Sequence, residues 1–291
     1  MSYRYRVLDV FTRRALEGNP LAVFPDNLNL PTETMQKIAK ELNLSETVFV
    51  MAATRAGCVA RLRIFTPARE LEFAGHPTIG TAFLLVDEGR TQGASQFLLE
   101  ENVGPVPIRV DSADGVPLIW LTTPPIRYGP KYDRKLCAAA IGLTSNDLLD
   151  AEPQLLSTGN PALFIPVKDP EAVDRAWLDA GGMTQLKKHH NESVLVFVFA
   201  PVPSGAYSRM FGPDHGVSED PATGSATGPL ARFMMDHRLI ADRDGTEFVS
   251  EQGAKMGRRS LLRVRIYGDN GANGIAVGGH VTPIIEATMT L

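Results

Sequence analysis

The sequence predicts an α+β protein of two similar domains, each a curved, mostly antiparallel sheet wrapped around a central helix. Short segments recur in the same order in both halves of the chain, and most other runs are strand-like. Each half also holds one helix that is apolar on nearly all sides. Such a helix is buried, and here mainly sheet is available to cover it. We therefore expect two units that are related by a pseudo-two-fold axis and packed face to face.

The repeat consists of four segments that each occur twice. The pairs are GNPLAVF from Gly18 and GNPALFI from Gly159, SETVFV from Ser45 and ESVLVFV from Glu192, RIFTP from Arg63 and RMFGP from Arg209, and EFAGHPTIGTAFLL and EDPATGSATGPLARFMM. Four matches in one order indicate two copies of one unit. We place the domains at residues 1–125 and 126–291, with the proline-rich segment 124–133 as the linker. The sequence leaves open whether the last strand pairs back into the first domain.

The first copy begins with two strands and an amphipathic helix. Apolar side chains at Met35, Ile38, Ala39 and Leu42 recur at helical spacing and predict a helix over Thr32–Leu42. Gly89 is expected to close a later, apolar helix. The other expected elements are strands at Arg4–Phe11, Leu21–Phe24, Thr47–Met51 and Ala60–Phe65, the apolar helix from about Pro77 to Asp87, and strands within SQFLLE, GPVPIRVD and PLIWLTT.

The second copy follows the same order. We expect strands at Ala162–Val167, Val194–Phe199 and Ala206–Phe211, a helix around Val173–Leu178, an apolar helix from about Gly224 to Asp236, and final strands within EFVSEQG, LLRVRIYG and GIAVGGHVTPIIEATMTL.

Composition excludes several classes of function. The chain has 29 basic and 33 acidic residues, so nothing predicts a nucleic-acid partner. Its two cysteines form no metal-ligand pattern, and no metal site is expected. No apolar stretch approaches the length of a membrane span, and the alternating, charged start MSYRYRVLDVFT is not a signal peptide. We expect a cytoplasmic protein with no membrane partner.

The candidate binding residues lie at the starts of two predicted helices. Gly75 and His76 open the first apolar helix, and Thr223, Gly224 and Ser225 open the second. The first turn of a helix has amides without intrahelical partners and a positive dipole end, which together favour an anion. If the two ends converge, they would hold a small carboxylate, with Gly75 and Gly224 allowing close approach of the backbone.

Catalysis needs a base beside this carboxylate. Glu46 follows a predicted helix end and opens a strand, and Glu192 is its approximate counterpart in the second copy. A carboxylic acid in a desolvated cleft has a raised pKa and can exchange a proton near neutrality. His76 and Asp220 are the other candidate proton carriers, and a helix end favours the neutral form of an adjacent histidine.

Each of these residues also has a plain structural explanation. Glu46 can belong to a simple turn, His76 can be a capping residue, and Asp220 before a proline is good chemistry for a helix start. Arg63 and Arg209 are interpreted as strand-edge residues rather than ligands.

At these residues the chain resembles the PhzF-like proteins, the phenazine-biosynthesis isomerase family. The resemblance rests on GNPLAVF, SETVFV, FTPARELEFAGHPTIGTA and GVSEDPATGSATGPLA, and it runs from the first strand to the last. It implies the diaminopimelate-epimerase-like fold, no cofactor and a homodimer. By position it implies Glu46 as the general acid/base, His76, Asp220 and Ser225 as residues that shape the site and carry or anchor protons, and amides near Gly75 and Gly224 as the carboxylate site.

One departure from the wider fold bears on the reaction. Cofactor-free amino-acid epimerases of this fold use two facing cysteines just before the helix glycines, where this chain has Ala74 and Thr223. Cys58 and Cys137 lie elsewhere in the sequence. Neither alanine nor threonine can exchange protons as a thiolate does, so a proton shift by a single carboxylate fits better than a two-thiol racemase.

The resulting hypothesis is an isomerase that moves a proton and a double bond on a small unsaturated or cyclic amino or hydroxy acid. The family substrate is trans-2,3-dihydro-3-hydroxyanthranilate, and the motifs alone do not fix it here. Two alternatives remain: an epimerase or lyase that uses the same carboxylate, and a non-catalytic member that binds a metabolite or a protein.

Overall fold

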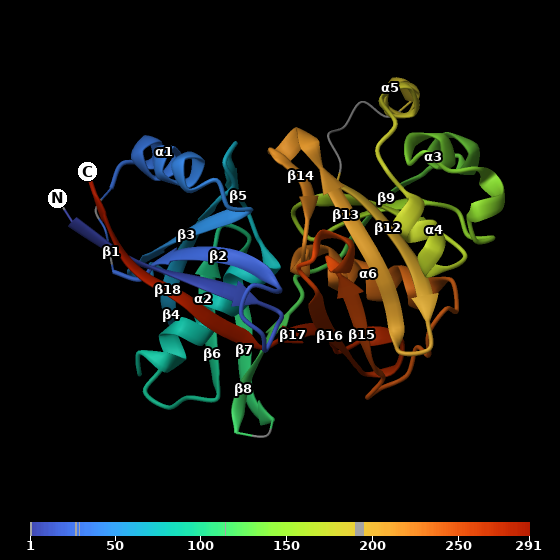
Figure 1. The fold of residues 1–291 in the computed structure, drawn as a ribbon. Coiled ribbons are helices and arrows are strands. Elements are labelled where there is room, and N and C mark those ends of the chain that lie inside the picture. Colours follow the sequence, from blue (N-terminus) through green and yellow to red (C-terminus); the bar gives the residue numbers. More distant parts are fainter. Residues whose placement is uncertain (1, 27, 29, 114, 190–194) are drawn as a thin grey trace.

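The α+β class is confirmed by the computed structural model, which describes residues 2–26, 28, 30–113, 115–189 and 195–291. Its strands form one mixed, 18-stranded sheet that curves around the buried helices α2 and α6 (Figure 1). The described elements of the first half are β1 (Ser2–Val10), β2 (Asn19–Phe24), α1 (Thr32–Leu42), β3 (Glu46–Met51), β4 (Cys58–Phe65), β5 (Glu70–Leu71), α2 (Gly75–Asp87), β6 (Gln96–Glu101), β7 (Gly104–Ala113) and β8 (Val116–Thr122).

The second half repeats much of this order. It contains β9 (Arg127–Lys131), α3 (Arg134–Ala140), β10 (Gln154–Ser157), β11 (Pro161–Pro166), α4 (Pro170–Arg175), α5 (Ala180–His189), β12 (Leu195–Val202), β13 (Gly205–Gly212), β14 (Val217–Asp220), α6 (Gly224–Asp236), β15 (Glu247–Gln252), β16 (Ser260–Tyr267), β17 (Gly274–Gly279) and β18 (Val281–Thr290), with 3₁₀ turns at Ser145–Asp147, Pro213–His215, Ala254–Met256 and Asp269–Gly271.

Helical crossovers join parallel strands in both halves. β2 runs parallel to β3 and β4 to β6, and β11 runs parallel to β12 and β13 to β15. The remaining neighbours are antiparallel. The two sheets expected from the sequence are joined by hydrogen bonds into one, because β8 pairs with β17. Whether a two-fold axis relates two domains with a boundary near residue 125 stays a prediction.

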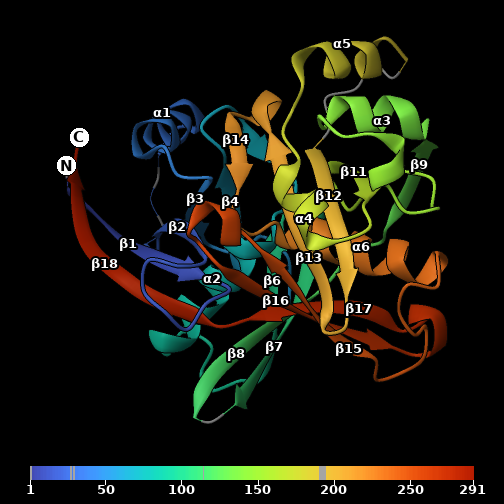
Figure 2. The ribbon, with the colours of Figure 1, turned by 45° about the vertical axis from the view of Figure 1, so that its right-hand side comes forward.

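The C-terminal run crosses from one half to the other. It was expected as one strand, but it is two, β17 and β18, with the break at His280. β17 pairs with β16 and β8, whereas β18 pairs antiparallel with β1 along its length, so that the two chain ends lie side by side (Figure 2). The break therefore marks the residue at which the chain changes its pairing partners.

One helix and the linker differ from the predictions. Segment 124–133 contains β9, because this part of the chain pairs with the edge of β10. The helix expected around Val173–Leu178 lies at Pro170–Arg175: the Asp169 side chain accepts a hydrogen bond from the Ala172 amide, and the chain turns extended at Ala176. The counterpart of Glu46 in the second copy, Glu192, lies outside the described residues.

The central helices are buried because apolar and small residues surround their axes. Every residue of α2 from Gly75 to Leu85 is buried, as are nearly all residues of α6. Their axes bring the two N-termini into contact at the centre of the molecule. A methyl group added at Gly75 would lie 2.4 Å from the carbonyl carbon of Gly224, and one at Gly224 would lie 2.9 Å from the Cα atom of Gly75. Only glycine fits at these two positions.

We expect Gly75→Ala to lower the free energy of unfolding by about 1–3 kcal/mol, the usual cost of overpacking. The obstacle is backbone, which cannot rotate away as a side chain can. Urea denaturation measures the effect. Gly181→Ala in α5 is the matched control, since its methyl group would meet only the side-chain oxygen of Asp179, at 3.2 Å. Equal stability of Gly75→Ala and the unmodified protein would contradict the close contact.

Candidate active site

The meeting point of the two helices forms a cavity of about 30 Å³. All the residues predicted for the site line it. The lining consists of Glu46, Thr66, Leu71, Ala74, Gly75, His76, Asn160, Leu195, Met210, Val217, Asp220, Thr223, Gly224 and Ser225. The volume holds about one water molecule, so a larger ligand requires the surrounding elements to move apart.

Glu46 and His76 face one another in this cavity. Glu46 is the first residue of β3 and His76 the second residue of α2. The Nε2 atom of His76 lies 3.1 Å from the Oε2 atom of Glu46. Neither atom has a hydrogen-bond partner among the described residues. Buried polar atoms are normally paired, so these two are poised to interact with a ligand.

Asn19, at the start of β2, contacts the His76 ring and bears on which of its nitrogens carries the hydrogen. Its Nδ2 atom donates hydrogen bonds to Asp220 Oδ1 at 2.8 Å and to the Ala222 carbonyl at 2.9 Å, and it lies 3.2 Å from His76 Nδ1. A side-chain amide nitrogen has two hydrogens and accepts none. A hydrogen on His76 Nδ1 would point at a nitrogen that cannot accept it, so the network favours the tautomer with the ring proton on Nε2, facing Glu46. This assignment follows from the hydrogen-bond network.

Burial governs the ionisation of the three titratable side chains. It lowers the pKa of His76 to about 3, so the ring is neutral. It raises the pKa of Glu46 well above the usual range, and the negative charge of Asp220 raises it further. Burial also raises the pKa of Asp220, against hydrogen bonds from Thr223, Asn19 and Ser45. A neighbouring pair of carboxyl groups with raised pKa values can exchange a proton near neutral pH.

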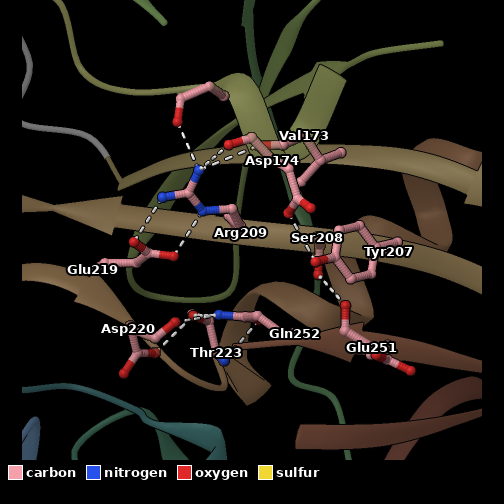
Figure 3. A network of polar contacts seen from close by, with 11 residues as sticks. Val173, Asp174, Tyr207, Ser208, Arg209, Glu219, Asp220, Thr223, Glu251 and Gln252 are labelled. Carbon is pink, nitrogen blue, oxygen red and sulfur yellow. Dashed lines mark hydrogen bonds and ion pairs between the residues drawn. The ribbon is translucent and has the colours of Figure 1, made fainter. Parts of the chain in front are cut away.

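A glutamine on β15 holds the second helix start in place. Gln252 donates from Nε2 to the Asp220 carbonyl at 2.7 Å and to Thr223 Oγ1 at 2.9 Å, and its Oε1 accepts from the Thr223 amide at 3.1 Å (Figure 3). Thr223 Oγ1 in turn donates to Asp220 Oδ2 at 2.7 Å. Asp220 and Thr223 are thus held by a fully buried side chain that the sequence analysis did not single out.

Two asparagines clamp the two helix starts from opposite halves. Asn19 donates to the carbonyl of Ala222, two residues before α6 begins, and Asn160 donates to the carbonyl of Phe73, two residues before α2 begins, at 2.8 Å. Both asparagines belong to the repeated GNP segment. The repeat was the signal that could have identified them, but only their side-chain contacts show why the motif occurs twice.

The backbone around Ser225 completes the second helix start. Thr158 Oγ1 donates to the Ser225 carbonyl at 2.9 Å, and Ser225 lines the cavity together with Thr223 and Gly224. Neither Thr223 nor Ala74, the residues that precede α6 and α2, makes a side-chain cap to its helix. The first amides of both helices therefore have no cap from these residues, as a site for an anion requires.

A second buried glutamate lies behind the start of α2. Glu101 Oε1 makes a short hydrogen bond with Thr78 Oγ1, which also lies 2.5 Å from the Ala74 carbonyl. A hydroxyl has one hydrogen, and it cannot be donated to two acceptors. A protonated Glu101 resolves the conflict: it donates to Thr78, and Thr78 donates to Ala74. Burial accordingly raises the pKa of Glu101 to about 8. A neutral Glu101 leaves the positive end of α2 uncancelled.

The two repeated arginines do not line the cavity. Arg63 forms a two-pronged ion pair with Glu70. Arg209 forms one with Glu219, as Figure 3 shows. β4 and β13 have strands on each side, but Arg63 itself pairs only with β3 and Arg209 only with β12, at the point where the neighbour on the other side changes. Arg209 is buried, and it also donates to the Ala176 carbonyl at 2.6 Å. These ion pairs fix the hairpins on either side of the cavity.

The cysteines also lie away from the cavity. Both are free thiols, and burial raises the pKa of Cys137 to about 12. Over the described ranges of the chain, no group of three or more histidine, cysteine, aspartate or glutamate side chains is arranged to hold a metal ion. No helix in that part of the chain combines the length and apolar character needed to cross a membrane.

A family model described as phenazine biosynthesis-like protein matches residues 8–287. The chain belongs to the PhzC-PhzF family. It is 37% identical to an uncharacterized isomerase of Mesorhizobium japonicum, over 98% of each chain. It is 36% identical to the trans-2,3-dihydro-3-hydroxyanthranilate isomerase of Pseudomonas aeruginosa, over 91% of each chain. Both of these relatives are named isomerases, and this member of the PhzC-PhzF family is an enzyme of the isomerase class.

A solved structure agrees with this placement. A predicted epimerase from Pseudomonas aeruginosa, 33% identical in sequence, superposes with a TM-score of 0.83 over 99% of each chain. The PhzC-PhzF chain described here therefore shares its whole architecture with a relative whose name points to epimerisation rather than to phenazine synthesis.

Replacing Asn19 should change the tautomer of the His76 ring. We expect Asn19→Ala to raise the population of the tautomer protonated on Nδ1, because nothing then disfavours a hydrogen on that atom. Nitrogen-15 NMR of the histidine ring measures the tautomer. Asn160→Ala removes the equivalent clamp without touching His76, and each variant should lose about 1 kcal/mol of stability. The same ring signals in both variants would contradict the assignment.

Replacing Glu101 should change how stability depends on pH. The group ionises near pH 4.5 in an unfolded chain and near pH 8 when folded. Between these values the folded state keeps a proton that the unfolded state has released, so the free energy of unfolding falls as pH rises. Glu101→Gln should flatten this fall between pH 5 and 8 in urea titrations.

The neighbouring glutamate supplies the control. Glu100 accepts hydrogen bonds from Thr54 and from the Arg55 amide, which lower its pKa, so it is ionised in both states above pH 5. Glu100→Gln should leave the slope between pH 5 and 8 unchanged. A slope in Glu101→Gln equal to that of the unmodified protein would show that Glu101 is ionised in the fold.

Proposed function

We propose that this chain is a cofactor-independent isomerase that moves a proton along a small unsaturated or cyclic amino or hydroxy acid. The observation that carries the proposal is the Glu46–His76 contact. A buried carboxyl group with a raised pKa faces a neutral imidazole, at the point where two helix N-termini meet. This arrangement combines a proton-exchanging group with a site for a carboxylate.

The substrate carboxylate would bind to the first amides of α2 and α6, near Gly75 and Gly224, with the Ser225 hydroxyl beside it. The cavity has no lysine or arginine in its lining. Backbone amides and helix dipoles would therefore supply the whole attraction for the anion, which suits a single carboxylate better than a dianion. Leu71, Leu195 and Met210 supply an apolar wall for the rest of the ligand.

Glu46 would take the proton from carbon in its ionised form and return it at a conjugated position. The Nε2–H group of His76 would stabilise the ionised Glu46 carboxylate before the proton transfer. After the transfer it would stabilise the negative charge that the substrate then carries. Asp220, held by Asn19 and Thr223, would tune the pKa of Glu46 through its own charge. Because the carboxylate form is the base, the rate of proton abstraction should fall as pH falls through the pKa of Glu46.

The relative of known name suggests the first substrate to test. Trans-2,3-dihydro-3-hydroxyanthranilate bears one carboxylate on an unsaturated ring, which fits an anion site beside an apolar wall. A homodimer and two domains, residues 1–125 and 126–291, remain part of the same proposal.

Epimerisation is the second candidate function. The predicted epimerase of Pseudomonas aeruginosa supports it through its shared architecture. Neither Cys58 nor Cys137 lines the cavity, so an epimerase built on this chain would have to work without a thiol pair. A lyase would release water from the substrate, whereas a member that only binds a metabolite or a protein would leave the ligand unchanged, and product analysis distinguishes the two.

The test is turnover of trans-2,3-dihydro-3-hydroxyanthranilate in heavy water, followed by absorbance and proton NMR. We expect a rearranged product with deuterium at the new C–H position. Glu46→Gln should reduce the rate by at least 10²-fold, the smallest contribution usual for a general acid/base.

Glu41→Gln is the matched control, since this exposed residue of α1 is not part of the cavity lining. Inversion at one carbon without a double-bond shift would favour the epimerase. A Glu46→Gln variant as fast as the unmodified protein would refute Glu46 as the base.

A further inference from the structure

A second cavity, of about 330 Å³, lies beside the loop that joins β1 to β2. It shares no lining residue with the candidate active site. Its walls come from this loop, from β8, from the start of β16 and from the break between β17 and β18. The lining residues are Phe11, Thr12, Arg13, Arg14, Glu17, Leu118, Arg259, Leu261, Arg263 and His280.

Positive charge is concentrated around this cavity. Four arginines and one glutamate line it, although the chain as a whole carries a net charge of −4. Arg14 lies 3.8 Å from Glu17, and Arg259 lies 2.7 Å from Glu251. Arg263 forms no ion pair with any carboxylate in the described part of the chain. The local excess of guanidinium groups is the pattern that proteins use for phosphate and carboxylate ligands.

The floor of the cavity is apolar. Phe11 and Leu118 are buried there, and Leu261 lies beside them. A simple inorganic anion would leave this surface uncovered. A ligand with two negative charges and an apolar body would satisfy the arginines and cover the floor at once, and the volume is at the lower end of ordinary small-molecule sites.

We propose that this cavity is a second binding site, for a small organic dianion with an apolar body, such as a phosphate monoester or a dicarboxylate. The candidate active site is suited to a single carboxylate, so the two sites would differ in ligand class. The proposal does not depend on the reaction that Glu46 performs.

The loop connects this cavity to the candidate active site through the backbone. Phe11 and Leu16 adopt positive φ angles of 67° and 68°, which are strained for residues other than glycine. The Gly18 amide donates to the Arg259 carbonyl at 3.1 Å, and the next residue is Asn19. A ligand that bridges the loop and β16 would therefore act one residue away from the side chain that contacts His76.

The strand side of the cavity is tied to the same loop. Arg258 donates to the carbonyls of Glu17 and Gly18, at 2.9 and 2.8 Å, and to Asp9 Oδ1 at 2.5 Å. The Leu261 amide donates to the Phe11 carbonyl at 2.9 Å. The loop and the start of β16 thus form one hydrogen-bonded frame around the cavity.

The test is isothermal titration of the full chain with phenyl phosphate, phthalate and inorganic phosphate. We expect phenyl phosphate or phthalate to bind at least tenfold more tightly than inorganic phosphate. Preference for the first or the second identifies the anionic group. The double variant Arg14→Glu/Arg263→Glu should weaken binding at least tenfold.

Arg243→Glu is the matched charge reversal, because Arg243 is exposed and lies outside the cavity lining. It should bind like the unmodified protein. Absence of binding by all three probes, or equal binding by the double variant and the control, would overturn the proposal. Circular dichroism verifies that the double variant is folded.

The link to Asn19 has its own readout. The nitrogen-15 signals of the His76 ring should shift when phenyl phosphate is added, and the shift should be absent in the double variant. Binding without this shift would support the site and overturn its connection to Asn19.

Discussion

The contact between the N-termini of α2 and α6 is the constraint on which the rest of the structure depends. Two helix ends with positive dipoles repel each other, and their amides have no partners within the helices. The chain holds them together nevertheless, with glycine at both points of contact and an asparagine from the opposite half on each approach. An anion between them would relieve the repulsion, which is the physical basis of the carboxylate site proposed above.

Burial then determines the charge of every ionisable group near this contact. His76 is kept neutral, and the carboxyl groups of Glu46, Asp220 and Glu101 are all shifted toward the protonated form. Glu101 shows why this matters for binding. An ionised carboxylate behind α2 would cancel the positive end that we propose as part of the anion site, whereas a neutral acid does not.

Much of this arrangement was readable in the sequence. The bounds of α1 and α6 were predicted to the residue. The repeat also led to the prediction that Gly75 and Gly224 lie close together, because apolar helices with small residues at their starts have few ways to be buried. Asn19 and Gln252 were not predicted. Asn19 lies in the repeated GNP segment, but its role, like that of Gln252, depends on contacts more than 28 positions away in the sequence, which the segment alone does not specify. The strand β9 was missed because, among the described strands, it pairs only with the edge of β10.

Asn19 and Asn160 each bind a backbone carbonyl just before a central helix, but only Asn19 also contacts titratable side chains. Asn19 also contacts His76 and Asp220, whereas the described contact of Asn160 is with a carbonyl alone. Glu46, His76 and Asp220 consequently form one connected cluster, and the other lining residues include no titratable side chain. Racemisation needs a proton donor on the face opposite the base, while a double-bond shift can proceed on one face with a single base. Glu46 and His76 come from the first half of the chain and Asp220 from the second, so the same cluster supplies the proton-exchanging groups for either reaction.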